Sequence, residues 1–357
     1  MKKCLIGLDP EQIKLLFKEL GQPSFRAQQL LNWLYEKAVV DFGKMSTFSQ
    51  ELRHSLEEKY AVTSLVLQRV QTSEDGQTEK FLWQLADGKL VESVLIASDD
   101  RRTVCVSSQV GCPARCAFCA SGQQGFFRNL ETEEIVGQIY LINNWLKERG
   151  ERVSHIVYMG MGEPFRNYEA VVQSIRLLIH PELFNISQRR ITVSTVGVTE
   201  GIERFATEDL KVNLVLSLHA PNQRIRQKII PYARQYPLDA ILEAMDLYAT
   251  KTKRDITYEY TLLSGINDNE EDAEELAKLL RNKQCTVNLI PYNPVAGLKL
   301  KRPEVSAIRR FREVLDQYRI INTCRYTKGD DIAAACGQLA LQEITETAEK
   351  SPLLVIQ

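Results

Sequence analysis

From residue 103 onward, apolar β-branched runs alternate about six times with amphipathic segments. The runs are TVCVSS, VSHIVYMG, RRITVST, KVNLVLSL, DITYEYTLL, CTVNLIPY and IINTCRY. Segments between them, such as EEIVGQIYLINNWLKERG and EEDAEELAKLLRNK, carry apolar residues at helical spacing. This alternation predicts an α/β domain with a parallel sheet and outer helices, either a complete or partial barrel or a doubly wound sheet. In each case the chemistry is expected at the carboxyl ends of the strands.

Residues 1–60 follow a different pattern, with three short helix signatures. Asp9 followed by Pro10, then Ser24 and then Ser46 are placed to begin these helices, because such residues cap free backbone N–H groups. The sequence therefore predicts a small N-terminal helical domain.

Residues 61–102 change to a period of two around the turn dipeptides DG at 75–76 and 87–88. That pattern predicts a short β-meander leading into the main domain. We assign the main domain to residues 103–345 and a C-terminal tail to residues 346–357.

The composition and the start of the chain indicate the cellular compartment, and the compartment decides whether the eight cysteines are expected to form disulfides. The formal net charge is -1 and 44% of the residues are hydrophobic, so no acidic or basic bias names a partner. Asp9 and Pro10 interrupt the apolar start of the chain, and no run approaches the roughly 20 apolar residues of a membrane span. A cytoplasmic protein without a membrane segment is expected, and there a cysteine cluster indicates metal binding or catalysis.

Cys112, Cys116 and Cys119 have the spacing CxxxCxxC, which gives three thiolates on one loop. A structural zinc site requires four protein ligands. Three thiolates on a [4Fe-4S] cluster instead leave one iron open for an exchangeable ligand. The zinc alternative stays open, as a knuckle completed by Cys105, His155 or His219.

The open iron suggests reductive cleavage of S-adenosylmethionine (SAM), in which the methionyl amine and carboxylate chelate the iron and a 5′-deoxyadenosyl radical is released. CxxxCxxC after the first strand of a β/α domain is specific for this chemistry. Further motifs follow in order: SSQVGC, QQGFFRNL, GMGEP, STVG, SLHA, LIPYNP and DIAAACGQL. With these, nearly the whole chain resembles the radical SAM superfamily, and more closely the RlmN and Cfr family of RNA adenine methyltransferases, with SSQVGC and QQGFFRNL most like RlmN. The resemblance implies a partial (β/α)6 barrel with an N-terminal domain that helps to hold RNA.

GMGEP supplies glycines that allow close backbone approach and a carboxylate for a cationic amine. Taken alone, this turn is weak evidence of a ligand site. His219, taken alone, is more simply a core histidine whose ring nitrogens have hydrogen-bond partners in the protein. By resemblance, seven residues contact SAM: Gly162, Glu163, Ser194, Ser217, Leu218, His219 and Asn293.

Cys336, in AAACGQL, taken alone is a small buried hydrophobic residue. Carbon 2 of adenine is electron-poor and cannot displace a methyl group from a sulfonium, so a radical route needs a carrier. The resemblance implies that one SAM methylates Cys336 and a second SAM generates the radical that activates this methyl group. It also implies that Cys105 releases the product by forming a disulfide and that Glu92 accepts a proton from the adduct. Taken alone, Glu92 is an exposed strand residue, and Cys324 competes for the carrier role.

Nine basic and three acidic residues between Lys299 and Lys328 give that segment a charge of +6. The segment could form a face that binds phosphates, or a helix surface that is only exposed to solvent. Arg128, Arg189 and Arg190 are candidates to extend it. The expected substrates are 23S rRNA, in the peptidyl transferase region, and tRNA next to the anticodon. A flavodoxin- or ferredoxin-type electron donor and a monomeric enzyme are also expected. The alternatives are Cfr-like methylation of carbon 8 and a zinc-containing RNA-binding protein without catalysis.

Overall fold

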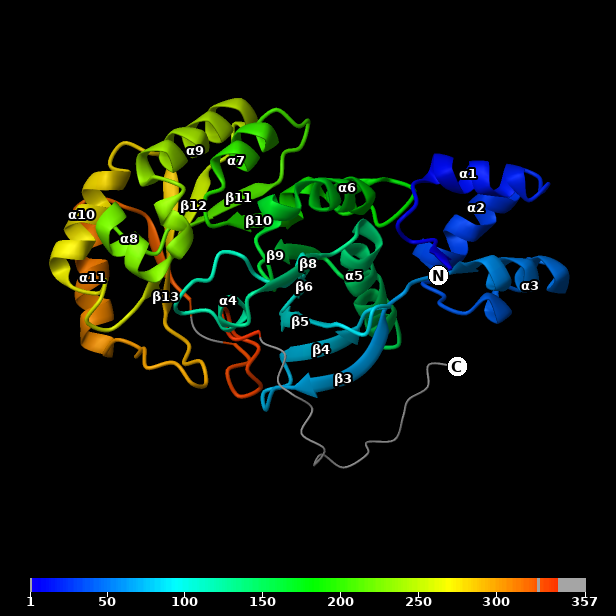
Figure 1. Ribbon diagram of the computed structural model, residues 1–357, viewed down its shortest axis with the longest axis horizontal. Coiled ribbons are helices and arrows are strands. Elements are labelled where there is room, and N and C mark those ends of the chain that lie inside the picture. Colours follow the sequence, from blue (N-terminus) through cyan, green and yellow to red (C-terminus); the bar gives the residue numbers. More distant parts are fainter. Residues whose placement is uncertain (1, 326–327, 340–357) are drawn as a thin grey trace.

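The described part of the chain, residues 2–325 and 328–339 of this computed structural model, is built around a ten-stranded sheet (Figure 1). The strand order is β14-β13-β12-β11-β10-β9-β6-β5-β4-β3, so the sheet stays open between β14 and β3. All seven runs found in the sequence form parallel strands, which confirms the partial barrel. They are β6 (Arg101–Cys105), β9 (His155–Tyr158), β10 (Ile191–Thr195), β11 (Asn213–Ser217), β12 (Ile256–Leu262), β13 (Cys285–Pro291) and β14 (Asn322–Cys324).

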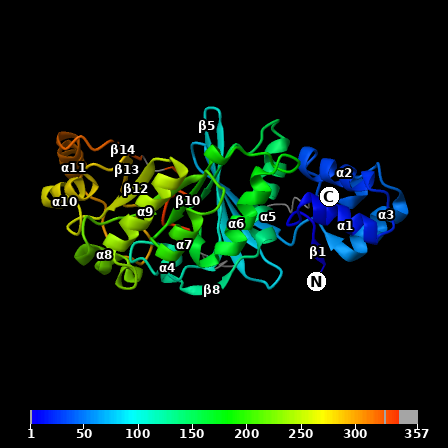
Figure 2. The ribbon, with the colours of Figure 1, turned by 90° about the horizontal axis from the view of Figure 1, so that it is seen from above.

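Helices connect the parallel strands, because a chain must cross over between parallel neighbours. Figures 1 and 2 show them on the outer side of the curved sheet. Their apolar faces pack on buried strand residues such as Val193, Leu214 and Tyr258. The helices are α5 (Thr132–Lys147), α6 (Tyr168–Ile179), α7 (Thr199–Phe205), α8 (Gln223–Ile229), α9 (Leu238–Thr252), α10 (Glu270–Leu280) and α11 (Val305–Gln317), with short helices η3 (Pro164–Asn167), η4 (Gln188–Arg190) and η5 (Pro231–Arg234).

The predicted meander forms β3 (Val66–Thr72), β4 (Thr78–Gln84) and β5 (Leu90–Ser98). Gly76 and Gly88 have φ of 67° and 81°, which a residue without Cβ adopts without strain, so both turns form where the sequence places them. β5 pairs antiparallel with β6, and β6 pairs parallel with β9. The meander therefore continues the barrel sheet.

The N-terminal helices are α1 (Pro10–Glu19), α2 (Phe25–Leu31), which continues as the π-helix η1 (Asn32–Glu36), and α3 (Gln50–Lys59). Asp9 caps α1 as predicted, but the Ser24 side chain caps nothing. The third helix begins later than predicted, and the Ser49 hydroxyl, rather than Ser46, accepts from Leu52 N. Between α2 and α3 lies the short helix η2 (Phe42–Lys44).

Two strands, β1 (Lys3–Cys4) and β2 (Tyr60–Ala61), pair where the N-terminal helices join the rest of the chain. A core of its own fills this helical unit, and Val136, Tyr140 and Leu177 of α5 and α6 pack against it. Figure 2 shows the unit at one end of the elongated molecule. None of the described helices combines the length and the apolar character of a membrane span.

Candidate active site

The CxxxCxxC loop lies at the carboxyl end of the first barrel strand, as predicted. After β6 the chain forms β7 (Gln109–Gly111), the cysteine loop, α4 (Ala120–Gln123) and β8 (Phe126–Asn129). Cys112 N donates to Gly125 O at 2.9 Å and Ala117 N donates to Ile229 O at 2.8 Å, which fixes both sides of the loop. The three thiols line one cavity with residues from later strand ends: Glu163, Ser194, Ser217, His219, Asn293 and Cys336.

Burial raises the pKa of the Cys112 thiol to about 12 and also raises the pKa of Cys116 and of Cys119. The thiolate charges add to this effect on Cys112 and Cys116, so the three groups are close enough to repel one another when ionised. Clustered soft thiolates are the donor set of iron–sulfur clusters. Among the described residues no three side chains converge as ligands of a single metal ion. The donor set therefore fits a cluster bound to the three thiolates.

Glu163 lies fully inside the cavity wall just after β9. Its carboxylate accepts hydrogen bonds from Phe165 N at 3.0 Å, Thr195 Oγ1 at 2.7 Å and Val196 N at 2.8 Å. Burial nevertheless raises the pKa of Glu163 to about 7, against these hydrogen bonds. Before it stands Gly162, with φ of 111°, where a Cβ would come within 2.7 Å of Gln109 Cβ. The GMGEP turn thus requires glycine and presents an acid that ionises near neutral pH.

If Glu163 binds the methionyl ammonium group of SAM, as we propose below, the affinity for SAM should increase about tenfold between pH 6 and pH 7.5, because Glu163 ionises over that interval. Equilibrium dialysis of labelled SAM against the cluster-loaded enzyme measures this. In Glu163→Gln the affinity should be lower and independent of pH over the same range. An affinity of the unaltered enzyme that does not change with pH would contradict the assignment.

His219 has a hydrogen-bond partner within the protein and also lines the cavity. Its Nδ1 accepts from Thr261 N at 2.9 Å, and its ring lies edge-on to Phe118 with the centroids 4.9 Å apart. Burial lowers the pKa of His219 to about 3, so the ring is neutral and Nε2 carries the proton. Ser194 and Ser217 share a hydrogen bond of 3.1 Å between their hydroxyls.

Two predicted SAM residues have other contacts. The Leu218 side chain is fully buried and Leu218 is not among the residues that line the described cavity; its backbone N–H donates to Glu259 O at 3.0 Å. Asn293 Nδ2 donates to Cys336 O at 3.1 Å, and Arg302 donates to Asn293 Oδ1 at 3.0 Å. Asn293 therefore joins the predicted cofactor site to the loop that carries Cys336.

Arg226, on α8, is a site residue that the sequence reasoning missed. It is 0% exposed, and its guanidinium donates to Leu218 O at 3.2 Å, to Ser217 O at 3.3 Å and to Val196 O. Its Nη1 has no hydrogen-bond partner among the described residues. Burial lowers the pKa of Arg226 to about 10, while the charges of Cys116 and Glu163 raise it. An arginine between Ile225 and Ile229 on an apolar helix face was the available signal.

Cys105 and Cys336 line a second cavity, of about 610 Å³, which shares Cys119, Asn293 and Cys336 with the first. Cys336 is exposed to this space, yet the surrounding protein raises its pKa to about 11. Burial raises the pKa of Cys105 well above its usual value, and the Cys336 charge is the next cause. The structure thus brings together two thiols 231 positions apart in the sequence.

The loop that carries Cys336 is held from several sides. Ala120 N donates to Gly337 O at 2.8 Å, and Ser121 Oγ donates to Leu339 O at 2.6 Å. On the opposite side Lys80 Nζ donates to Ala333 O at 3.3 Å. In Figure 1 this red segment lies between α4 and β4, which agrees with these contacts. Residues 340–345, assigned to the main domain, and the tail 346–357 lie outside the described residues.

Glu92 is buried at 1% exposure, so its interpretation as an exposed strand residue is wrong. Its Oε1 lies 3.2 Å from Lys80 Nζ, and its backbone oxygen accepts from Ser107 Oγ at 2.5 Å. Val91, Ser93 and Val94 are buried as well, because β5 is covered on both faces along this stretch. Cys324 lies on β14 opposite Leu289, as expected for a strand residue.

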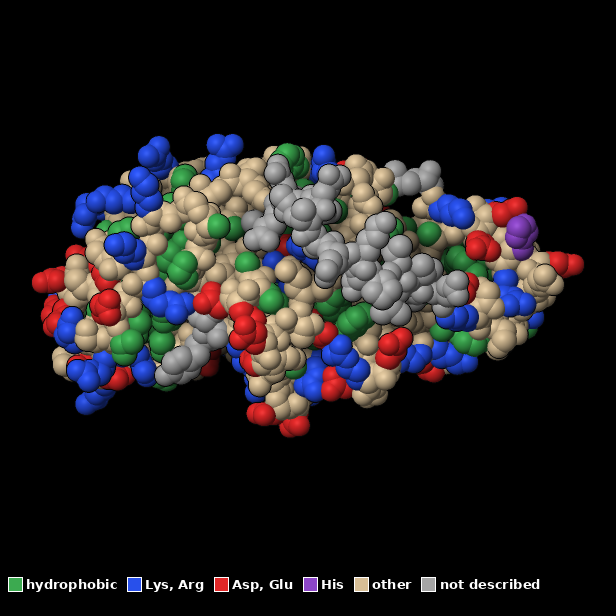
Figure 3. All heavy atoms as spheres, turned by 90° about the horizontal axis from the view of Figure 1, so that it is seen from below, with side chains coloured by type: hydrophobic (Ala, Val, Ile, Leu, Met, Phe, Trp, Pro, Cys, Tyr) green, Lys and Arg blue, Asp and Glu red, His purple; other side chains and the backbone are tan. Residues whose placement is uncertain are grey.

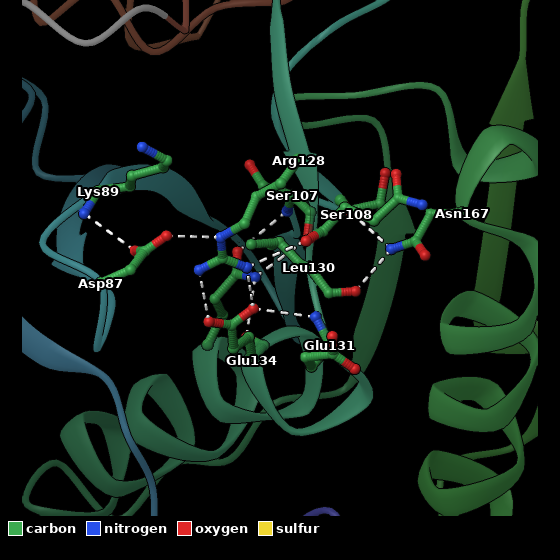
Figure 4. Close-up of polar contacts among 11 residues, drawn as sticks. Asp87, Lys89, Ser107, Ser108, Arg128, Leu130, Glu131, Glu134 and Asn167 are labelled. Atoms are coloured by element: carbon green, nitrogen blue, oxygen red, sulfur yellow. Dashed lines mark hydrogen bonds and ion pairs between the residues drawn. The ribbon is translucent and has the colours of Figure 1, made fainter. Parts of the chain in front are cut away.

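Arg128 forms ion pairs within the protein. Figure 4 shows its guanidinium between Asp87, at 2.8 Å, and Glu134, with contacts of 2.7 and 2.8 Å. Asn167 Nδ2 in the same network donates to Ser108 O at 2.8 Å and to Leu130 O at 2.7 Å. These contacts fasten β8 to α5 and the strand ends, so Arg128 does not extend an RNA-binding face.

The segment between Lys299 and Lys328 is also partly paired. Arg310 contacts Glu270 at 3.2 Å, Arg312 donates to Asn322 Oδ1 at 3.0 Å, and Lys328 donates to Ala97 O at 3.1 Å. Figure 3 shows basic side chains with acidic ones between them at the end of the molecule that carries α10 and α11. The charge of +6 is therefore not one continuous cationic surface.

Other cations lie at the second cavity. Its lining includes Arg101, Arg189, Arg190 and Arg325, which stand near the amino ends of β6 and β10 and after β14. The pKa of His155 at this rim is lowered by burial and then by the charges of Arg101 and Arg190. We call these four arginines, at the amino ends of β6 and β10 and at the carboxyl end of β14, the cationic mouth of the second cavity.

Comparison with known proteins agrees with this geometry. The radical SAM superfamily model matches residues 106–280, and the model of the ribosomal RNA large subunit methyltransferase N-terminal domain matches residues 4–62. The probable dual-specificity RNA methyltransferase RlmN 2 of Protochlamydia amoebophila is 66% identical over 94% of each chain. The probable dual-specificity RNA methyltransferase RlmN of Fervidobacterium nodosum is 45% identical over 97% of this chain and 99% of its own.

Among solved structures, a radical SAM methyltransferase from Sphaerobacter thermophilus superposes with a TM-score of 0.92 at 42% identity, covering 94% of this chain and 99% of its own. The identities and the coverage extend over both the N-terminal helices and the barrel. This chain therefore belongs to the radical SAM superfamily and, within it, to the RlmN family of RNA methyltransferases.

Proposed function

We propose that this enzyme methylates carbon 2 of adenine in the peptidyl transferase region of 23S rRNA and next to the anticodon of tRNA. The observation that carries the proposal is the pair Cys105 and Cys336 at one cavity, beside the three thiols of the CxxxCxxC loop. Direct methyl transfer needs one acceptor and no second thiol. Two thiols facing one space support a covalent intermediate that is formed on one of them and released by the other.

Cys112, Cys116 and Cys119 would hold one [4Fe-4S] cluster, and Glu163, Ser194, Ser217, His219, Asn293, Gly162 and the Leu218 backbone would hold SAM. The bound cluster supplies the electron that cleaves SAM to the deoxyadenosyl radical. The three thiols would keep it in a closed pocket, with Phe118 buried among them. The ionised Glu163 would orient the methionyl amine, and Asn293 would keep the Cys336 loop in contact with the cofactor site.

Cys336 would act first, by taking a methyl group from one SAM. A second SAM would then activate this methyl group by loss of a hydrogen atom, so two SAM molecules are used per turnover. After the carbon radical has added to adenine, the adduct radical would return one electron to the electron-transfer route that supplied it, and Glu92 would accept the proton of carbon 2. Cys105 would then attack the Cys336 sulfur, so that an S–S bond forms while the S–C bond breaks and the carbon takes the electron pair and a proton.

RNA would approach through the cationic mouth of the second cavity. A base within folded RNA must be extruded to reach buried chemistry, and arginines fix the phosphates around it. Arg189→Ala and Arg190→Ala should each weaken RNA binding and reduce the slope of log affinity against log salt by about one. Filter binding of protein-free 23S rRNA at several salt concentrations measures this. Lys278→Ala, on exposed α10, is the matched control, and an equal effect there would contradict the proposed entry.

A flavodoxin- or ferredoxin-type protein would supply the electrons, since cleavage of each radical-forming SAM consumes one and disulfide reduction needs two. All eight cysteines are free in the structure, which suits a reducing compartment such as the cytoplasm. We propose that the enzyme works as a monomer, because both cavities are lined within one chain.

Mass spectrometry of nucleosides from ribosomal and transfer RNA, with and without the gene, tests the function. We expect 2-methyladenosine in both RNA classes only when the enzyme is present. Methylation at carbon 8 would establish the Cfr-like reaction instead. Anaerobically purified protein should contain about four irons per chain. Stoichiometric zinc without iron would contradict catalysis by this route.

A further inference from the structure

Lys80, on β4, is a buried cation that no step of the proposed reaction uses. Its side chain is 2% exposed, and the carboxylate of Glu92, at 1% exposure, lies 3.2 Å from its Nζ. A buried lysine or glutamate without a partner would shed its charge, because burial disfavours the ionised form of each. The contact between them offsets part of the cost of burying two charges, so Lys80 and Glu92 form a buried ion pair.

The sheet register places Lys80 close to the reacting thiol. Lys80 pairs with Val94 across β4 and β5, and Val94 pairs with Cys105 across β5 and β6. Directly paired residues point to the same face, and so does Glu92, two positions before Val94. Neighbouring strands are about 4.8 Å apart, so the backbones of Lys80 and Cys105 stand about 10 Å apart.

A second contact of Lys80 reaches the carrier loop. Its Nζ also donates to Ala333 O at 3.3 Å, three residues before Cys336. One ammonium group thus contacts both the proposed proton acceptor and the loop that carries the methylene group.

On the face of the sheet that carries Glu92, the register places Cys105 of β6 opposite Val94, two positions after Glu92. Glu92 itself is not among the residues that line the cavity of Cys105 and Cys336. The charged side chains of that loop point to other partners: Lys328 to Gln77 and Ala97, Asp330 to Gln338, and Asp331 to Glu74. Glu79, next to Lys80 on β4, faces the opposite side of the sheet and pairs with Arg149 at 2.8 Å.

We propose that Lys80 is a positioning residue that keeps Glu92 ionised and aligned with the Cys336 loop, so that the adduct can lose its proton. This inference rests on the proposed function. In the step concerned, the adduct radical has already given one electron back to the electron-transfer route; the bond between carbon 2 and its hydrogen then breaks, its electron pair stays on the ring and restores its aromaticity, and the proton binds the Glu92 carboxylate. The carboxylate becomes a neutral acid while Lys80 remains an ammonium group.

The test uses Lys80→Gln, which keeps a donor for Ala333 O but removes the charge. The pKa of Glu92 should then rise, so that Glu92 is neutral at pH 7 and the RNA–protein adduct accumulates. Turnover should fall about 10²-fold at pH 7, the usual contribution of a general base. It should recover about tenfold per pH unit above that, until Glu92 ionises. Raising the pH to 9 should therefore discharge adduct trapped at pH 7.

The measurement uses the cluster-loaded full-length enzyme with SAM and protein-free 23S rRNA, with the covalent adduct detected on denaturing gels. Glu92→Gln should trap the adduct at both pH values, and Lys80→Arg, which keeps the charge, should turn over at pH 7. Equal pH profiles of Lys80→Gln and the unaltered enzyme would overturn the inference, as would trapping that pH 9 does not relieve.

Two further variants distinguish a wrong inference about Lys80 from misfolding of Lys80→Gln and from failure of the proposed function. If Lys80→Gln does not fold, Lys80→Arg carries the test, and trapping by Lys80→Arg at pH 7 would refute the role of the charge. Cys105→Ala serves as a reference for the covalent route. If Cys105→Ala forms no adduct, the proposed function itself fails, whereas an adduct there with a normal Lys80→Gln profile overturns the role of Lys80 alone.

Discussion

Cys336→Ala should abolish RNA methylation, with a loss of at least about 10³-fold, because we propose Cys336 as the group that carries the methylene to the base. The fold should survive, because the contacts that hold the loop at this position use backbone atoms. Asn293 donates to the Cys336 carbonyl, and Ala120 donates to the Gly337 carbonyl. Alanine also matches its small neighbours Ala334 and Ala335.

Measuring methylation together with iron content and SAM cleavage distinguishes loss of the methylene carrier from damage to the cofactor site. Iron content and the slow cleavage of SAM in the absence of RNA should be retained in Cys336→Ala, since the three cluster thiols are unchanged. Cys324→Ala is the matched control: it removes a partly buried thiol from β14, and methylation should continue. Methylation by Cys336→Ala at a normal rate, or its loss only in Cys324→Ala, would reverse the assignment of the carrier.

The barrel could be predicted from the sequence because the pattern that marks each strand lies within the strand itself. Each of the seven runs is long, apolar and β-branched, and each became a parallel strand in chain order. Polar clusters after these runs marked the cavity, since the carboxyl ends of parallel strands meet at one edge. Boundaries were less certain where two hydroxyl residues competed as caps, and Ser49 begins α3 where Ser46 was expected.

The pairing of distant groups could not be predicted from patterns alone. Glu92 was expected to be exposed as a charged strand residue, and only its contact with Lys80, which also binds the loop at 328–339, shows why it is buried. Arg128 appeared to be a free cation until Asp87 and Glu134, 41 positions before it and 6 after it, proved to hold it. Net charge along a segment likewise says nothing about internal partners, as Arg312 and Lys328 show.

Cys105→Ala should convert a catalytic enzyme into one that becomes covalently attached to its RNA. The adduct would form at Cys336 as before, but no thiol would remain to break the S–C bond, so turnover should stop after one event per chain. Denaturing gels should show protein that migrates with RNA, and nuclease digestion should leave an adenine-derived mass on the peptide containing Cys336. Cys105→Ala, Cys336→Ala together should form no adduct.

The electrostatics of the two thiols predict how release of the adduct should depend on pH. The pKa of Cys105 is raised by burial and then by the charge of Cys336, so Cys105 is a protonated, weak nucleophile in the free enzyme. The pKa of Cys336 is raised to about 11, so Cys336 is also protonated near neutral pH, and release of the adduct depends on ionisation of the Cys105 thiol. Adduct discharge should therefore accelerate with pH in the unaltered enzyme. Cys285→Ala, a buried thiol at the start of β13, should discharge normally, and a Cys105→Ala enzyme with normal turnover would show that another group releases the product.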